Sequence, residues 1–218
     1  MTITHLFFDV GGVLGNNGWD REQRAAATRR FELEAGELEE MHSEAVAMME
    51  LGRTTLDEYL KTAVFYRPRS FTPEAFKEFM FAQSTPNPDT IELARALART
   101  GRYRMMTLNN ESAELNQHRI ERFGLGDIFT AFFSSCWIGV LKPARRIYEV
   151  ALAMAQARPE TSVFIDDRER NLEPARLLGM RTIAFSDAGR LKEELAGLGV
   201  TEKGERGRGK GERNSAPA

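Results

Sequence analysis

The pattern of apolar and polar positions divides the chain into segments of two kinds. Residues 5–10, His-Leu-Phe-Phe-Asp-Val, form a short apolar run that predicts a buried strand. Residues 11–18 contain four glycines and two asparagines and predict a loop. From Asp20 to about Ser84, apolar residues recur at helical spacing, and residues 37–51 show this with Leu38, Met41, Ala45 and Met48 or Met49. This stretch is therefore predicted to form several helices.

Two of these helices have recognisable starting residues. Thr55 precedes Leu56-Asp57-Glu58 and is a candidate N-cap, and Thr72 precedes Pro73, a residue favoured at the first helical position. The run Thr85-Pro86-Asn87-Pro88 then interrupts the helical pattern. We take it as a boundary, because two prolines so close together disfavour a continuing helix.

Beyond this boundary, predicted helices alternate with short apolar strands. The strands are expected at Tyr103–Leu108, Ala131–Ser135, Ser162–Ile165 and Arg181–Phe185. This alternation is typical of an α/β fold with a doubly wound parallel sheet. We therefore expect an α/β core formed by residues 1–15 and 87–200, with residues 16–86 inserted after its first strand as an all-helical domain. The tail, residues 201–218, is rich in Gly, Lys and Arg and is predicted to be disordered.

Composition and charge exclude several classes of protein. Hydrophobic residues make up 42% and charged residues 28% of the 218 residues, which excludes global disorder. The formal net charge of -2 argues against a nucleic-acid-binding protein. No apolar run reaches the roughly 18–20 residues that a membrane span needs, and the N-terminus lacks the features of a signal peptide. Because Cys136 is the single cysteine, no intramolecular disulfide can form, and we expect a cytoplasmic protein.

Polar side chains follow the predicted strands at the points where the strands end. In open α/β sheets, ligands bind beyond the carboxyl ends of the strands, so these side chains are expected to converge on one edge. The three histidines, in contrast, show no metal-binding spacing. The converging residues are Asp9, Asn109, Asn110, Lys142, Asp166 and Asp167.

This set of residues favours the transfer of a phosphoryl group to a carboxylate. Several carboxylates in one crevice repel one another unless a cation lies among them, and oxygen ligands without His or Cys favour Mg²⁺. An aspartate can serve as a nucleophile, while a lysine and amides stabilise negative charge on phosphoryl oxygens. Taken singly, the aspartates and asparagines could cap a helix or form a turn, and Lys142 could be a solvated loop residue.

Four motifs in order resemble the haloacid dehalogenase superfamily of hydrolases, in the branch with a helical cap inserted after the first motif. That branch includes phosphatases and the N-terminal domain of epoxide hydrolases. Each motif alone is weak, but four in this order and spacing cover nearly the whole chain. The motifs are Phe7-Phe8-Asp9-Val10-Gly11-Gly12-Val13-Leu14, Met106-Thr107-Leu108-Asn109-Asn110, Gly139-Val140-Leu141-Lys142-Pro143, and Phe164-Ile165-Asp166-Asp167-Arg168.

The resemblance implies a Mg²⁺-dependent phosphatase of a small phosphorylated metabolite, and it implies roles for individual residues. Asp9 would be the nucleophile and a metal ligand, and Lys142 would balance charge on the nucleophile and the phosphate. The backbone carbonyl of Gly11 and the carboxylate of Asp167 would complete the protein ligands of Mg²⁺. Asp166 would act through water or Lys142, and Asn109 and Asn110 would contact the substrate.

Two positions depart from the pattern of these phosphatases. They usually carry a second Asp two residues after the nucleophile, as general acid and base, but this chain has Gly11 there. Asp20 and Glu111 are candidate replacements. The second departure is Asn109, where Ser or Thr is usual; an Asn side chain can still donate an N–H group to a phosphoryl oxygen.

Two alternative functions remain open at this point. A 2-haloacid dehalogenase would use the Asp nucleophile without a metal, but members of that class usually carry Ser and Asn rather than paired carboxylates in the last motif. A catalytically impaired protein that binds phosphate would retain the anion site without turnover. Gly11 and Asn109 motivate this second alternative.

Overall fold

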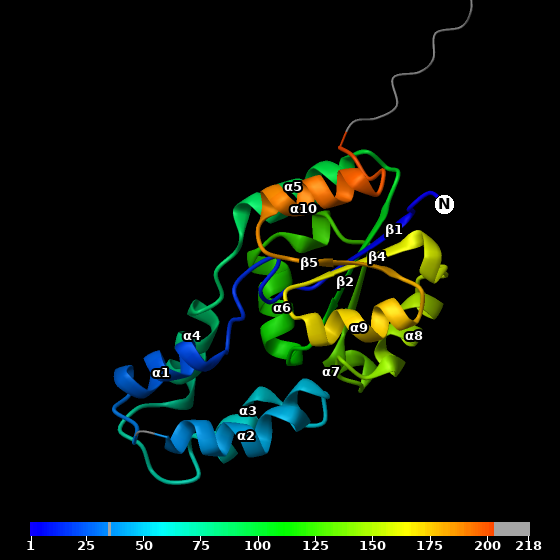
Figure 1. Ribbon diagram of the computed structural model, residues 1–218. Coiled ribbons are helices and arrows are strands. Elements are labelled where there is room, and N and C mark those ends of the chain that lie inside the picture. Colours follow the sequence, from blue (N-terminus) through cyan, green and yellow to red (C-terminus); the bar gives the residue numbers. More distant parts are fainter. Residues whose placement is uncertain (35, 203–218) are drawn as a thin grey trace, which may run out of the picture.

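The computed structural model describes residues 1–34 and 36–202 (Figure 1). Five strands form one parallel sheet in the order β3-β2-β1-β4-β5. The first strand therefore lies at the centre, between strands that follow the helical insertion in sequence. The strands are β1 (His5–Phe8), β2 (Arg104–Asn109), β3 (Ala131–Ser134), β4 (Ser162–Asp166) and β5 (Arg181–Ala184).

Helices cover both faces of this sheet, as in a doubly wound fold (Figure 1). On one face, α5 (Pro88–Arg99) and α10 (Ala188–Gly197) pack together, and α8 (Arg145–Met154) and α9 (Glu169–Leu177) cover the other. The side chains of β1 alternate between two apolar clusters: Leu6 and Phe8 belong to one, and Phe7 belongs to the other. All three are completely buried, which confirms the predicted α/β core.

The inserted segment forms a helical cap with an apolar core of its own. Trp19, Phe31, Tyr59 and Phe76 belong to this core, and the indole Nε1 of Trp19 donates a hydrogen bond to the Tyr59 hydroxyl at 2.9 Å. In Figure 1 these helices lie beyond one end of the sheet. The cap helices are α1 (Arg21–Arg30), α2 (Glu37–Glu50), α3 (Leu56–Ala63) and α4 (Pro73–Ala82).

The capping residues read from the sequence start their helices as expected. The Thr55 side chain accepts from the backbone N–H of Glu58, and the Glu58 carboxylate accepts from the backbone N–H of Thr55, which is a complete capping box. Thr72 caps α4, in which Pro73 is the first residue. Each cap satisfies a helix-end N–H group that would otherwise lack a partner.

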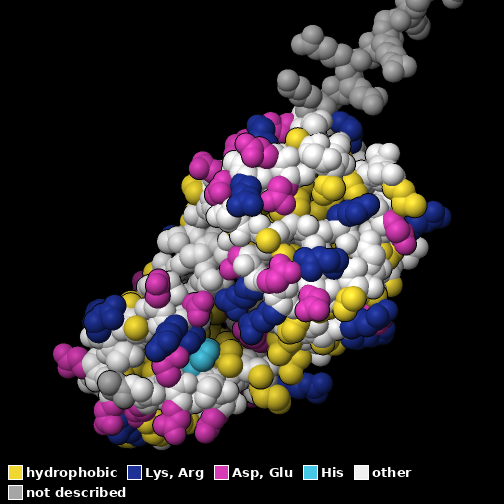
Figure 2. Space-filling view, in the orientation of Figure 1, with side chains coloured by type: hydrophobic (Ala, Val, Ile, Leu, Met, Phe, Trp, Pro, Cys, Tyr) yellow, Lys and Arg dark blue, Asp and Glu magenta, His cyan; other side chains and the backbone are white. Residues whose placement is uncertain are grey.

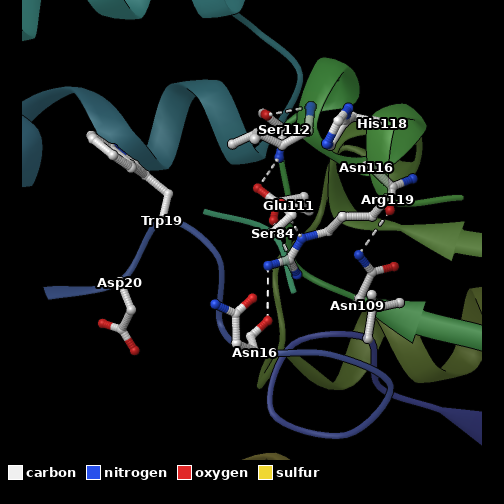
Figure 3. A network of polar contacts seen from close by, with 12 residues as sticks. Asn16, Trp19, Asp20, Ser84, Asn109, Glu111, Ser112, Asn116, His118 and Arg119 are labelled. Atoms are coloured by element: carbon white, nitrogen blue, oxygen red, sulfur yellow. Dashed lines mark hydrogen bonds and ion pairs between the residues drawn. The ribbon is translucent and has the colours of Figure 1, made fainter. Parts of the chain in front are cut away.

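The two linkers between cap and core lie against α6 (Ala113–Arg122), as Figure 3 shows. Arg119, only 2% exposed, donates from Nη2 to the backbone carbonyl of Asn16 at 2.8 Å and from Nε to the hydroxyl of Ser84 at 3.3 Å. Asn16 belongs to the outgoing linker and Ser84 to the returning one. One core side chain thus holds both ends of the insertion.

A second contact joins the cap to α7 (Ser135–Ile138), the short helix after β3. The Ser135 hydroxyl donates to the backbone carbonyl of Glu50 at 2.7 Å and accepts from the backbone N–H of Glu111 at 3.1 Å. A Cβ on Gly52 would overlap the carbonyl oxygen of Cys136, so glycine permits the close approach of cap and core. The carboxyl end of α2 is therefore fixed against the core.

Some sequence expectations differ from the structure or lie outside it. The strand expected at Ala131–Ser135 ends at Ser134, because α7 begins at Ser135. Two short 3₁₀ helices complete the core, at Leu125–Asp127 and Pro159–Thr161. The limits of core and cap remain our interpretation, and residues 203–218 of the predicted disordered tail lie outside the described residues. Within the described residues, no helix is both long enough and apolar enough to cross a membrane.

Candidate active site

The candidate nucleophile Asp9 lies directly after β1 and faces a lysine. Its backbone N–H donates to the Ile165 carbonyl at 2.9 Å, which extends the β1–β4 pairing to the end of the strand. The Nζ atom of Lys142 lies 3.0 Å from Asp9 Oδ1 and 2.6 Å from Asp166 Oδ2. Asp9, Lys142 and Asp166 are all at least 93% buried, so this charged group is shielded from solvent.

Asp166 has hydrogen-bond donors on both of its carboxylate oxygens. The side-chain amide of Asn171 donates to Oδ1 at 2.9 Å, the backbone N–H of Arg168 donates to the same oxygen at 2.9 Å, and Lys142 donates to Oδ2. With these partners Asp166 holds Lys142 in position. A role of Asp166 through water or Lys142 stays a prediction.

Asp167 has a carboxylate oxygen without a hydrogen bond in the described part of the chain, although Nε of Arg168 lies 3.9 Å from it. Its Oδ1 atom is buried and has no hydrogen-bond partner among the described residues. The Asp167 carboxylate packs against the loop after β1, where a Cβ on Gly12 would collide with it. Gly12 also has φ +77°, a conformation that favours glycine. The second glycine of the first motif thus lets Asp167 approach Asp9.

Three carboxylates come close enough together to hold a cation. Asp9, Asp166 and Asp167 each offer one oxygen, and these oxygens lie within 4.8 Å of one another. Burial raises the pKa of Asp9 to about 7; the charge of Lys142 opposes this rise, and the charges of Asp166 and Asp167 contribute to it. Burial and Asp166 likewise raise the pKa of Asp167. A hard cation bound here would relieve this repulsion, so the donor set fits Mg²⁺.

Lys142 remains a cation in this position. Burial opposes its charge, but the carboxylates of Asp9 and Asp166 outweigh burial and raise its pKa. Its Nζ atom also lies 5.3 Å from the centroid of the Phe164 ring, a cation–π contact. A lysine held between two carboxylates can balance the charge of an anion bound beside Asp9.

The two asparagines after β2 have different surroundings. Asn110 exchanges two hydrogen bonds with the backbone of Lys142: its Nδ2 donates to the carbonyl at 3.0 Å, and its Oδ1 accepts from the N–H at 2.8 Å. It also lines the cavity beside Asp9. Asn109 is 1% exposed, does not line this cavity, and donates from Nδ2 to Asn116 Oδ1 at 3.0 Å. Substrate contact by Asn109 and Asn110 stays a prediction, and the two hydrogen bonds of Asn110 hold the backbone of Lys142.

A cavity of about 270 Å³ separates the carboxylate cluster from the cap. Figure 2 shows a hollow between the two parts of the molecule, with Lys and Arg side chains beside it. Core and cap both contribute to its wall. The core side of the wall is formed by Asp9, Gly11, Asn110, Glu111, Arg119, Lys142, Arg168, Arg170 and Asn171. The cap side is formed by Trp19 and Asp20, which precede α1, and by Arg24, His42, Val46, Met49 and Glu50.

The tertiary contacts of three residues of this site could not be predicted from the sequence pattern. Arg119 lies on α6 as one of several charged residues, and only its contacts with both linkers reveal its role. Glu50 ends a cap helix rich in glutamates, and nothing in its spacing marks it out. Arg168 belongs to the fourth sequence motif, but the motif does not predict its contact with Asp20. Nη2 of Arg168 lies 3.5 Å from Oδ2 of Asp20, a residue 148 positions earlier in the chain. Such contacts arise between segments that are distant in sequence.

Comparison with known proteins shows matches over most of the chain. A family model described as haloacid dehalogenase-like hydrolase matches residues 3–179. Bifunctional epoxide hydrolase 2 of Rattus norvegicus is 33% identical over 132 residues, which cover 59% of this chain. The match covers only 24% of that relative, so the chain spans about a quarter of its length.

Two solved structures have similar folds. A HAD family enzyme from Bacteroides thetaiotaomicron, solved in complex with magnesium and inorganic phosphate, superposes with a TM-score of 0.74 at 22% identity, covering 87% of this chain and 98% of that one. L-2-haloacid dehalogenase from Xanthobacter autotrophicus, with chloropropionic acid covalently bound, has a TM-score of 0.59 at 18% identity, covering 92% and 85%. At these identities the likeness concerns the fold. The family match extends from the strand before Asp9 to the helix after Asp167, and the chain belongs to the haloacid dehalogenase-like hydrolases.

Proposed function

We propose that this hydrolase is a Mg²⁺-dependent phosphatase of small phosphorylated metabolites that acts through a phospho-aspartate at Asp9. The observation that carries the proposal is the cluster of Asp9, Asp166 and Asp167, whose oxygens lie within 4.8 Å of one another around Lys142. The similar Bacteroides enzyme, solved with magnesium and inorganic phosphate, supports it.

The free oxygens of the cluster suggest which groups would hold the metal. Asp9 and Asp167 would provide carboxylate oxygens, and the carbonyl of Gly11 would provide a third protein ligand. Bound there, Mg²⁺ would neutralise charge on the phosphoryl oxygens and lower the pKa of the crowded carboxylates. Asp166 is the poorer ligand, since donors already occupy both of its oxygens.

The chain's own residues would carry out the first half of the reaction. An oxygen of Asp9 attacks phosphorus, the bond from phosphorus to the leaving oxygen breaks, and Lys142 balances the negative charge beside Asp9. Asn110 keeps Lys142 in place through its two hydrogen bonds with the lysine backbone. The cap encloses the cavity above these groups and would keep bulk water away from the reaction.

Hydrolysis of p-nitrophenyl phosphate by the purified protein tests this proposal. We expect turnover with Mg²⁺, loss of turnover in EDTA, and loss of turnover in Asp9→Asn at any concentration of Mg²⁺. Asp127→Asn is a matched control, because Asp127 is exposed and does not line the cavity. Turnover that persists in Asp9→Asn would contradict the proposal.

The alternatives give different results in the same samples. A dehalogenase would release chloride from 2-chloropropionate in the presence of EDTA and would lose this activity in Asp9→Asn. A catalytically impaired protein would bind inorganic phosphate without turnover of either substrate. The carboxylate cluster favours the phosphatase over the dehalogenase, because a metal-independent reaction has no need for three adjacent carboxylates.

A further inference from the structure

The cavity beside Asp9 lacks an acid at the usual place. When the phosphorus–oxygen bond breaks, an alkoxide or phenoxide leaving group needs a proton, and general acid help contributes about 10²–10⁴-fold to such a step. Residue 11 is a glycine and has no side chain to supply that proton. Any general acid must therefore come from elsewhere in the wall of the cavity.

Apart from Asp9, three described carboxyl side chains line this cavity: Asp20, Glu50 and Glu111. Two of them already have partners. Asp20 accepts from the backbone N–H of Arg21 at 2.7 Å and lies 3.5 Å from Nη2 of Arg168. Glu111 accepts from the backbone N–H of Ser112 at 3.0 Å, and its Oε2 lies 3.6 Å from Nη1 of Arg119. These contacts hold both carboxyl groups against partners of their own. Burial raises the pKa of Glu111, with the charge of Arg119 opposing the rise, but the Glu111 carboxyl group stays engaged with Arg119 and Ser112.

Glu50 differs from both of them. Its carboxyl group has no hydrogen bond or ion pair with any side chain or backbone group in residues 1–34 and 36–202. Its backbone, in contrast, is fixed, because the Ser135 hydroxyl donates to the Glu50 carbonyl at 2.7 Å. The cap therefore holds the residue in place against the core and leaves the carboxyl group available to a ligand.

The position of Glu50 also suits a leaving group. Asp9 lies on the core side of the cavity, and an in-line displacement puts the leaving oxygen on the side of phosphorus opposite to the attacking oxygen. With the phosphoryl group bound at the carboxylate cluster, that opposite side faces the cap. Glu50 is the last residue of α2 and lines the cavity from the cap.

The charges around Glu50 keep its proton available near neutral pH. Burial, and then the charge of Glu111, raise its pKa to about 7, and the charges of three cations oppose this rise. The cations are Arg168, Lys142 and Arg170. Of the polar residues on the cap helices packed against α2, Arg24 of α1 lines the cavity, and Tyr59 of α3 interacts electrostatically with Glu50. Tyr59 stays neutral because burial raises its pKa. A carboxylic acid with a pKa near 7 can donate a proton at neutral pH and take one back.

His42, the histidine on the same cavity wall, does not meet this requirement. Its Nδ1 atom lies 2.8 Å from the Tyr59 hydroxyl. Burial, and then the charge of Arg24, lower its pKa to about 4, so the ring is neutral at pH 7. A neutral imidazole is a much weaker acid than a protonated carboxyl group, which leaves Glu50 as the better donor.

We propose that Glu50, a cap residue, is the general acid and base of this site and takes the role that residue 11 cannot fill. The inference rests on the proposed phosphatase function. As Asp9 bonds to phosphorus and the bond to the leaving oxygen breaks, the Glu50 carboxyl proton passes to that oxygen, and the product leaves as a neutral hydroxyl compound. In the second half, the Glu50 carboxylate takes a proton from the water that attacks phosphorus, so Asp9 is freed, inorganic phosphate forms and Glu50 is protonated again.

The test compares two aryl phosphates of similar size in wild type, Glu50→Gln and Glu44→Gln. Phenyl phosphate has the more basic leaving group, and p-nitrophenyl phosphate needs little help from an acid. We expect Glu50→Gln to lower kcat/KM for phenyl phosphate by about 10²–10⁴-fold and to have a much smaller effect on p-nitrophenyl phosphate. In wild type, kcat/KM for phenyl phosphate should fall as pH rises through about 7, and Glu50→Gln should remove this fall.

Glu44→Gln is the matched control, because Glu44 is an exposed glutamate on the same helix. Its kinetics on both substrates should equal those of wild type. The p-nitrophenyl phosphate activity of Glu50→Gln shows in the same experiment that the variant is folded.

Two results would overturn the role of Glu50 while leaving the phosphatase intact. One is an equal loss on both substrates, which would indicate a structural or binding role. The other is no loss on phenyl phosphate. Absence of any Asp9-dependent turnover in wild type would instead refute the proposed function, and the role of Glu50 with it.

Discussion

The buried ion pair behind the cavity leads to a quantitative prediction about stability. Arg119 is 2% exposed, and its guanidinium contacts Glu111, the Asn16 carbonyl and the Ser84 hydroxyl (Figure 3). Arg119→Met retains much of the side-chain length but removes the charge and every donor. Glu111, 7% exposed, would then keep only the backbone N–H of Ser112 as a partner.

The expected cost of Arg119→Met is about 3–5 kcal/mol in the free energy of unfolding. Removal of one partner from a buried pair has a cost of this size, because it leaves an uncompensated charge in a medium of low dielectric constant. The Asn16 carbonyl and the Ser84 hydroxyl lose a donor as well. Since folded domains are stable by about 5–15 kcal/mol, the variant should lose a large fraction of its stability.

The loss should depend on pH in a defined direction. Burial raises the pKa of Glu111, and the charge of Arg119 opposes this. Without Arg119 the pKa of Glu111 rises further. At acidic pH, Glu111 in the folded variant is therefore protonated, and no buried unpaired charge remains. The destabilisation should therefore be smaller at pH 5 than at pH 8. For the same reason, adding Glu111→Gln to Arg119→Met should restore part of the stability at pH 8.

Urea unfolding followed by circular dichroism measures these differences. A shift in the midpoint at constant slope reports a change in stability. Arg29→Met is the control, because Arg29 is exposed, and it should change stability by less than about 0.5 kcal/mol. A loss below about 1 kcal/mol for Arg119→Met, or a double variant less stable than Arg119→Met at pH 8, would refute the reasoning.

Three further predictions concern the metal site, pH and the cap. Gly12→Ala places a Cβ against the Asp167 carboxylate, at a residue with φ +77°. We expect the variant to lose the rise in Tm that Mg²⁺ binding produces in wild type. If Mg²⁺ raises the Tm of the variant as much as that of wild type, Asp167 is not a metal ligand. Burial raises the pKa of Glu50 in the folded state from its usual value of 4.5 to about 7, so the folded chain holds an extra proton between these pH values. The contribution of Glu50 to stability is therefore present below about pH 4.5 and lost as pH rises through 7. Glu50→Gln should make the urea midpoint less dependent on pH over this range. If the midpoint of the variant depends on pH as steeply as that of wild type, the pKa shift is contradicted. Trp19→Phe removes the hydrogen bond to Tyr59 and should lower stability by about 1 kcal/mol in thermal unfolding, whereas an unchanged Tm would mean that this bond adds nothing.

The contrast between Asp9 and Glu50 shows which site residues the local sequence pattern can predict and which it cannot. Asp9, Asp166 and Asp167 could be selected from the sequence because each lies at or directly after the end of a strand in a parallel sheet, and Lys142 lies in the segment that follows β3 and α7. Parallel strands end at the same edge, so position along the strand is enough to predict that they meet. Glu50 follows no strand, and its approach to the core depends on the way the whole cap packs.

The sequence by itself determined the α/β core, the helical insertion, and the identity of the residues at the carboxyl edge of the sheet. These follow from periodicity and from turn and capping residues, which act between near neighbours in the chain. Only the tertiary structure decided that Arg119 holds both linkers, that Asn109 is directed to Asn116, and that Glu50 faces the cavity with a free carboxyl group. The physical reason is that these contacts join segments far apart in the chain, Arg119 and Asn16 being separated by 103 residues, so their geometry depends on how cap and core pack together.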